Sequence, residues 1–106
     1  MKPNITAIIR DKKGRVLSIA KNSYVKSHPL QAKFAKQAGE PAKIYLHAEI
    51  NAIVKLRHPS LAHSIHVIRL DKSGNARLAK PCRCCALAIQ SMGIKEVTYT
   101  TDPGKS

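Results

Sequence analysis

Short apolar runs alternate with polar, turn-forming stretches along the chain. β-Branched and aliphatic residues predict four strands, at residues 5–9, 16–20, 65–70 and 96–101. The stretch between the first two runs predicts a tight turn, because Gly14 can take a positive φ at low cost. Apolar residues at helical spacing predict two helices, at residues 44–56 and 81–92. Pro81 suits the first turn of the second helix, since its missing N–H would be unpaired there.

The predicted elements follow the order β-β-α-β-α-β, which indicates an α/β fold with a mixed sheet. Strand–helix–strand connections are right-handed, so we expect both helices on one sheet face with their N-termini close together. A long polar loop at residues 22–42 contains a stretch, residues 30–38, for which we expect a short helix. Polar residues interrupt the strands, so the second sheet face is expected to be lightly covered. We expect either the 30–38 segment or a second subunit to cover it.

The length and composition indicate one small domain over residues 1–106. Hydrophobic residues make up 43% of the chain, which is enough for a compact core and argues against a disordered or collagen-like chain. No apolar run reaches the roughly 18–20 residues of a membrane span, and the N-terminal stretch has no signal-peptide core. We therefore expect a cytoplasmic protein without a membrane partner. Three cysteines in such a chain favour a metal or a thiol over a disulfide framework.

The chain is strongly basic, with 19 Lys and Arg against 6 Asp and Glu and a formal net charge of +13. Such a charge favours polyanionic partners, which include nucleic acids, nucleotide phosphates and anionic membrane surfaces. The charge is spread along the chain, with one concentration at residues 10–15, where the first turn is expected. This cluster is either a solvated turn or a phosphate-binding patch. Charge alone therefore names no function.

Two short motifs, each at a predicted helix start, carry the candidate chemistry. They are His47-Ala48-Glu49 and Pro81-Cys82-Arg83-Cys84-Cys85. Cys82 and Cys85 are three residues apart on a helix, so their sulfurs face the same way and can share one ion. Thiolates favour zinc, and His47 would complete three protein ligands, which leaves the fourth tetrahedral position open to water. Zinc lowers the pKa of such a water toward 7, and Glu49 lies close enough to exchange protons with it.

The remaining cysteine and the other histidines have weaker claims. Successive helical residues turn by about 100°, so Cys84 points away from Cys82 and is interpreted as a core or surface residue. Four histidines have no ligand partner at useful spacing and are interpreted as satisfied polar side chains: His28, His58, His63 and His66. Separately, each motif is a weak signal. Together, at helix starts on one sheet face, they favour one zinc ion per chain.

At these residues the sequence resembles the zinc-dependent cytidine and deoxycytidylate deaminase superfamily (CMP/dCMP-type deaminases), whose signature is H-x-E followed by P-C-x-x-C. The resemblance covers residues 5–101. Residues 47–53 resemble the first catalytic helix of deoxycytidylate deaminases, and residues 91–97 resemble the exit of the second helix into a strand. This resemblance implies a compact cytidine-deaminase-like fold and a homo-oligomer, as in much of the family.

The resemblance also implies roles for the motif residues. His47, Cys82 and Cys85 would bind one Zn²⁺, and zinc-bound hydroxide would attack C4 of cytosine to give uracil. Glu49 would protonate the ring nitrogen beside the amino-bearing carbon and then pass a proton to the departing ammonia.

The substrate contacts are expected in two places. The resemblance implies that the Ala48 backbone contacts the base, and that Asn22, just after the second predicted strand, contacts the sugar or base. The expected substrate is a free cytidine nucleotide such as CMP or dCMP. Its phosphate would meet basic residues of the long loop: Lys26, His28, Lys33, Lys36 and Lys43.

Two alternatives remain open at this point. One is deamination of cytosine or adenine within single-stranded DNA or RNA, which the charge of +13 favours. One Phe, three Tyr and no Trp leave few stacking platforms for such a strand. The other is a non-enzymatic zinc or nucleic-acid-binding module. Glu49 argues against that alternative, because a structural zinc site needs no acid beside an open position.

Overall fold

A computed structural model describes residues 4–41 and 45–103. In chain order its helices and strands are β1 (Asn4–Arg10), β2 (Val16–Lys21), α1 (Pro29–Gln37), α2 (Ala48–Val54), the 3-10 turn η1 (Pro59–Leu61), β3 (Ser64–Leu70), β4 (Ala76–Arg77), α3 (Arg83–Ser91) and β5 (Glu96–Tyr99). The predicted strands and helices are all present, with shifts of a few residues at their ends. Among the described residues, no helix is both long and apolar enough to cross a membrane.

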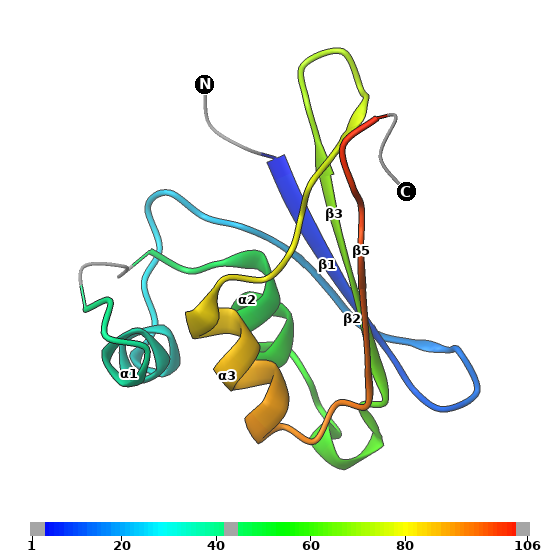
Figure 1. The fold of residues 1–106 in the computed structure, drawn as a ribbon. Helices are drawn as coiled ribbons and strands as arrows, with labels where there is room; N and C mark the ends of the chain where they lie inside the picture. The colour runs from blue at the N-terminus through cyan, green and yellow to red at the C-terminus, as the bar shows by residue number, and fades with distance from the viewer. Residues whose placement is uncertain (1–3, 42–44, 104–106) are drawn as a thin grey trace.

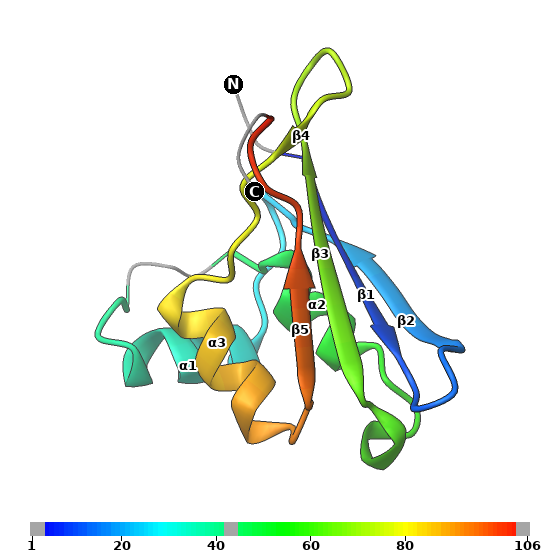
Figure 2. The same ribbon diagram turned by 45° about the vertical axis from the view of Figure 1, so that its right-hand side comes forward.

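A mixed sheet forms the platform of the fold. β1 is hydrogen-bonded to β2 on one side and to β3 on the other, and it is antiparallel to both. The other edge of β3 is shared by two strands, which Figure 2 shows beside it: β5 runs parallel along Ser64–Val67, and β4 pairs antiparallel with Arg69 and Leu70. This arrangement confirms the predicted α/β fold with a mixed sheet.

The helices cover one face of this sheet (Figure 1). Side chains alternate between the two faces of a strand, and four residues of β1 and β3 on the helical side are fully buried: Ala7, Ile9, Ile65 and Val67. They belong to one hydrophobic cluster with residues of α2 and α3, including Ile50, Ile53, Ala88 and Ile89. The prediction that both motif-bearing helices lie on the same sheet face is therefore confirmed.

The long loop contains α1, as predicted for residues 30–38. His28 is its N-cap residue, because the His28 Nδ1 atom accepts a hydrogen bond from the Leu30 N–H at 3.0 Å. The side chains that α1 buries lie at helical spacing: Gln31, Phe34 and Ala35. They pack toward α3 and α2, so α1 extends the helical layer that Figure 1 shows beside the sheet.

The expectation that the 30–38 segment covers the second sheet face is wrong. A helix this short has one apolar side, and α1 uses that side in its contacts with α3 and α2. No described helix lies over the opposite face of the sheet (Figure 1). That face carries Ile19, which is 56% exposed, with Ile8 opposite it on the neighbouring strand. Cover by a second subunit stays a prediction.

The helix α2 begins later than its apolar pattern predicts. The predicted start, residue 44, lies outside the described residues, and the observed start is Ala48. The residues just before it are extended because Leu46 is engaged elsewhere: its N–H donates to the Lys26 carbonyl, and its carbonyl accepts from the Ser23 N–H. These bonds tie the loop after β2 to the start of α2.

The helix α3 and the chain before it also differ in detail from the prediction. α3 begins at Arg83 and not at Pro81, because Cys82 has an extended backbone and acts as the N-cap residue. It ends before Gly93, whose φ of 73° stops the helix. After β3 the chain turns back into β4, an element that the apolar pattern did not predict because it has only two residues.

Candidate active site

Two helix starts bring the candidate metal ligands together. His47 is the N-cap residue of α2, and Cys82 is the N-cap residue of α3. The His47 Nδ1 atom lies 3.3 Å from the Cys85 Sγ atom and 3.6 Å from the Cys82 Sγ atom. The donor atoms of the three residues all lie within 4.8 Å of one another. Two motifs that are 35 residues apart in the chain therefore meet in one group.

The two cysteine sulfurs of this group are coupled through a proton. The Cys85 thiol donates to the Cys82 sulfur, and this bond, with help from His47, lowers the pKa of Cys82 to about 3. The same bond and burial raise the pKa of Cys85. Two sulfurs and one imidazole nitrogen form a donor set that zinc binds, and such a set leaves one tetrahedral position for water or substrate. His47, Cys82 and Cys85 therefore form a group suited to one zinc ion, which would take the place of the shared proton.

Glu49 lies beside the His47, Cys82 and Cys85 group. It stands in the first turn of α2, and only 6% of it is exposed. Burial raises the pKa of Glu49 above its ordinary value, although its own backbone N–H, His47 and the Cys85 thiol oppose the rise. A carboxyl group with a raised pKa exchanges protons more effectively near neutral pH. The site thus holds a buried carboxyl group with a raised pKa next to the candidate ligands.

A cavity of about 440 Å³ opens at this group. Ligand sites typically have volumes of roughly 300–1,000 Å³, so the cavity has room for a small molecule. Its lining includes His47, Glu49 and Cys82, and also the two predicted substrate contacts Asn22 and Ala48. The Asn22 Oδ1 atom accepts a hydrogen bond from the Ile5 N–H at 3.1 Å, which fixes this side chain at the cavity wall.

Among the described residues, the basic side chains predicted as phosphate contacts do not line this cavity: Lys26, His28, Lys33 and Lys36. Lys26 lines a neighbouring groove, which shares Asn22 and Ser23 with the cavity. His28 caps α1 through its Nδ1 atom and lines neither the cavity nor that groove. Lys43 lies outside the described residues.

The sequence did not predict several residues of the cavity lining, among them two tyrosines and two basic residues. Tyr24, Tyr45, Arg69 and Lys80 line the cavity, and they come from separate segments that share no local motif. The one available signal concerns Arg69. It lies two residues after Val67 on β3, and alternation along a strand places both on the helical side of the sheet.

Gln31 was also missed, and it supports the site from behind. This side chain of α1 is fully buried, its Oε1 atom accepts the His47 N–H at 3.2 Å, and its Nε2 atom donates to the Cys84 Sγ atom at 3.5 Å. Cys84 is itself fully buried and lies outside the group of three ligands. Gln31 therefore links α1 to the starts of both site helices.

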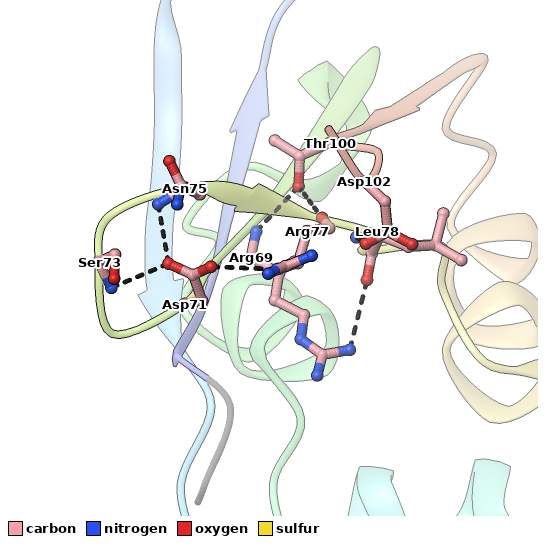
Figure 3. A network of polar contacts seen from close by, with 8 residues as sticks. All are labelled: Arg69, Asp71, Ser73, Asn75, Arg77, Leu78, Thr100 and Asp102. Atoms are coloured by element: carbon pink, nitrogen blue, oxygen red, sulfur yellow. Dashed lines mark hydrogen bonds and ion pairs between the residues drawn. The ribbon is translucent and has the colours of Figure 1, made fainter. Parts of the chain in front are cut away.

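A polar network holds the chain segment that leads to α3 (Figure 3). The Arg69 N–H donates to the Thr100 hydroxyl at 3.0 Å, and that hydroxyl donates to the Arg77 carbonyl at 2.6 Å. The Leu78 N–H donates to the Asp102 carboxylate at 3.0 Å, and its carbonyl accepts from the Arg69 guanidinium at 3.5 Å. These bonds join β3, β4 and the chain after β5 on one side of the cavity.

An acid placed to exchange protons beside a three-ligand zinc group is the arrangement of the zinc-dependent base deaminases, and the fold and site correspond to that class. Comparison with known families agrees, since residues 1–101 match the cytidine and deoxycytidylate deaminase zinc-binding region. The chain belongs to this family. A search among curated proteins finds no match.

Proposed function

We propose that the protein hydrolyses the 4-amino group of cytosine in a free cytidine nucleotide such as CMP or dCMP, which gives the uracil nucleotide and ammonia. The observation that carries this proposal is Glu49, because its carboxyl group is buried in the same cavity as the zinc-binding group. A zinc site with only a structural role needs four protein ligands and no acid. Membership of the cytidine and deoxycytidylate deaminase family supports the same reaction.

The proposed mechanism assigns the proton transfers to Glu49 and the substrate contacts to Ala48 and Asn22. His47, Cys82 and Cys85 would hold the zinc ion, which would lower the pKa of a water molecule toward 7 and so make hydroxide available for addition at C4. Glu49 would take one proton from that water and deliver it to the ring nitrogen N3; it would then take the proton of the new C4 hydroxyl group and pass it to the amino group, so that the C4–N bond breaks, ammonia leaves and the C4 carbonyl forms. The Ala48 backbone stands between His47 and Glu49 at the cavity wall, where it would contact the base. Asn22, fixed by Ile5, would contact the sugar.

We further propose that the enzyme works in the cytoplasm as a homo-oligomer. All three cysteines are described and none forms a disulfide, which supports a reducing compartment. The sheet face that no described helix covers, with Ile19 exposed on it, supports contact with a second subunit.

The test incubates the zinc-loaded protein with CMP, dCMP and cytidine and follows the formation of the uracil product. Glu49→Gln is expected to keep the zinc and to lower kcat by roughly 10²- to 10⁴-fold, which is the usual contribution of a general acid–base group. Glu96→Gln is the matched control, because Glu96 is exposed on β5, away from the cavity. Full activity of Glu49→Gln, or a zinc-loaded protein that turns over none of these substrates, contradicts the proposal.

One observation favours a second candidate, the deamination of cytosine or adenine within single-stranded DNA or RNA. A groove of about 490 Å³ adjoins the cavity and shares Asn22 and Ser23 with it. Among the described residues, no acidic side chain lines this groove, and three lysines do: Lys21, Lys26 and Lys55. A strand whose target base enters the cavity would pass its phosphates along these lysines. Tyr24 and Tyr45 at the cavity would offer stacking surfaces to the neighbouring bases.

Substitutions in the groove lined by Lys21, Lys26 and Lys55 distinguish the two candidate substrates, a free nucleotide and a single strand. The double variant Lys21→Gln/Lys55→Gln is compared with Lys12→Gln/Lys95→Gln, which removes the same charge from exposed positions elsewhere. If the substrate is a strand, the first variant alone lowers turnover of a cytosine-containing oligonucleotide and weakens its salt dependence by about two phosphate contacts. Turnover of CMP with none of the oligonucleotide excludes the strand.

A further inference from the structure

Two basic side chains line the active-site cavity, and the chemistry at the zinc-binding group uses neither. Arg69 comes from β3, and Lys80 comes from the segment before α3. The acid of the cavity lining, Glu49, and the cysteine sulfurs form the anionic part of the site. A substrate with its own negative charge needs a separate cationic contact, because it would otherwise enter a cavity with charges of its own sign.

The sheet register places Arg69 close to the residue proposed to contact the sugar. Arg69 pairs with Ile5 across β3 and β1. Ile5 exchanges two hydrogen bonds with Asn22 on its other side, each 3.1 Å long. Asn22, Ile5 and Arg69 therefore lie side by side, with neighbouring segments about 4.8 Å apart. Arg69 is thus about 10 Å from Asn22 at the backbone, a distance that a nucleotide spans between its sugar and its phosphate with the help of a long side chain.

The guanidinium group of Arg69 has one hydrogen-bond partner in the described part of the protein, and its positive charge is available to a ligand. Figure 3 shows it below the Leu78 carbonyl, to which it donates one hydrogen bond at 3.5 Å. A guanidinium group has five N–H donors, so four remain. Among the described residues no carboxylate forms an ion pair with Arg69. Arg77, on the same hairpin, differs in this respect, because it is paired with Asp71 at 3.1 Å.

We propose that Arg69, together with Lys80, binds the 5′-phosphate of the nucleotide and makes the cavity selective for a nucleoside monophosphate over the nucleoside. This inference rests on the proposed function, since it assumes a cytosine base at the zinc-binding group. A guanidinium group matches two phosphate oxygens with parallel hydrogen bonds, and such charge-assisted bonds are stronger than neutral ones. The Leu78 carbonyl accepts one hydrogen bond from the guanidinium group at 3.5 Å, which leaves the other N–H donors for phosphate oxygens.

The test measures binding without turnover. Zinc-loaded Glu49→Ala protein is titrated calorimetrically with CMP and with cytidine. CMP is expected to bind about ten- to 100-fold more tightly than cytidine, the usual effect of a hydrogen bond to a charged group. Adding Arg69→Gln is expected to remove most of this difference, Arg69→Lys to restore part of it, and Lys80→Gln to reduce it to a smaller extent. Arg57→Gln is the matched control, because Arg57 is exposed and lies outside the cavity.

The outcomes separate this inference from the proposed function. Equal affinities for CMP and cytidine in the Glu49→Ala protein overturn the phosphate site, whether or not the wild-type protein is active. If Arg69→Gln weakens both ligands by the same factor, Arg69 only supports the Leu78 segment and the inference is also overturned. If CMP binds tightly through Arg69 but the wild-type protein releases no uracil product, the phosphate site stands and the proposed reaction fails.

Discussion

The substitution Gln31→Leu tests whether α1 supports the zinc-binding group. Leu has nearly the volume of Gln and keeps the helix propensity of the position, so the change removes hydrogen bonds with little change in packing. The bonds lost include the one that Gln31 accepts from the His47 N–H at 3.2 Å and the one that it donates to the Cys84 sulfur at 3.5 Å. The second is weak, because a thiol sulfur is a poor acceptor.

The expected cost follows mainly from the His47 N–H. A buried donor that loses its partner costs about 1–3 kcal/mol of the free energy of unfolding. For a domain of this size each kcal/mol corresponds to about 4–8 °C in Tm, so the expected fall in Tm is roughly 5–20 °C. The same N–H belongs to the residue whose ring is a candidate zinc ligand. Zinc affinity is therefore expected to fall roughly tenfold, as for other groups that orient a metal ligand from behind.

The assay is thermal unfolding with and without zinc, together with a zinc titration against a competing chelator. Gln37→Leu is the matched control, because it makes the same change on the same helix at an exposed position. Substitutions of that kind usually change stability by less than about 0.5 kcal/mol. If Gln31→Leu unfolds at the same temperature as Gln37→Leu and binds zinc equally well, the support of His47 by α1 is refuted.

Three further predictions concern zinc, the core and the β3–β4 hairpin. Removal of zinc by a chelator is expected to lower Tm, because free zinc at 100 times its Kd adds about 2.7 kcal/mol to the stability. Ile50→Ala, at a fully buried position of α2, is expected to cost about 2–5 kcal/mol in a denaturant titration, whereas Val54→Ala, at a partly exposed position, costs less. Hydrogen bonds from the backbones of Asn75 and Ser73 lower the pKa of Asp71 below its ordinary 3.8. The contribution of Asp71 to the stability of the folded protein is therefore complete above pH 3.8, and it is lost as the pH falls through the lower pKa of the folded state. Asp71→Asn is expected to speed amide hydrogen exchange at Ser73 and Asn75.

The sequence predicts the sheet and the helices that carry the motifs, because these elements have strong local patterns. Ile65 and Val67 alternate with polar residues along β3, and the 81–92 stretch has a helical period and a glycine stop. The His-x-Glu and Cys-x-x-Cys spacings likewise predict which side chains meet, since each motif is local and both stand at helix starts. Strands, helices and short motifs can therefore be predicted from the residues that form them.

The rest of the site depends on contacts between distant segments, and no local pattern encodes these. Gln31 lies 16 residues before His47, and only the packing of α1 against α3 and α2 places its amide behind the zinc-binding group. Arg69 and Lys80 are separated by the two-residue strand β4, which is too short to give a periodic signal. The same limit explains the wrong position predicted for the 30–38 segment, because a short apolar helix face fits either side of a sheet.

The net charge of +13 can be related to the charges that line the cavity. The phosphorylated substrate that we propose would approach Glu49 and two cysteine sulfurs, so a basic surface around the cavity would offset the repulsion between these negative charges. At physiological ionic strength a charge acts over about 8 Å, so most exposed lysines and arginines contribute only to the approach of the substrate. The contact itself depends on the few within that distance of the phosphate, which we infer to be Arg69 and Lys80. The affinity for CMP should therefore fall with added salt while the affinity for cytidine changes little, and a salt dependence that persists in Arg69→Gln/Lys80→Gln would place the relevant charges elsewhere.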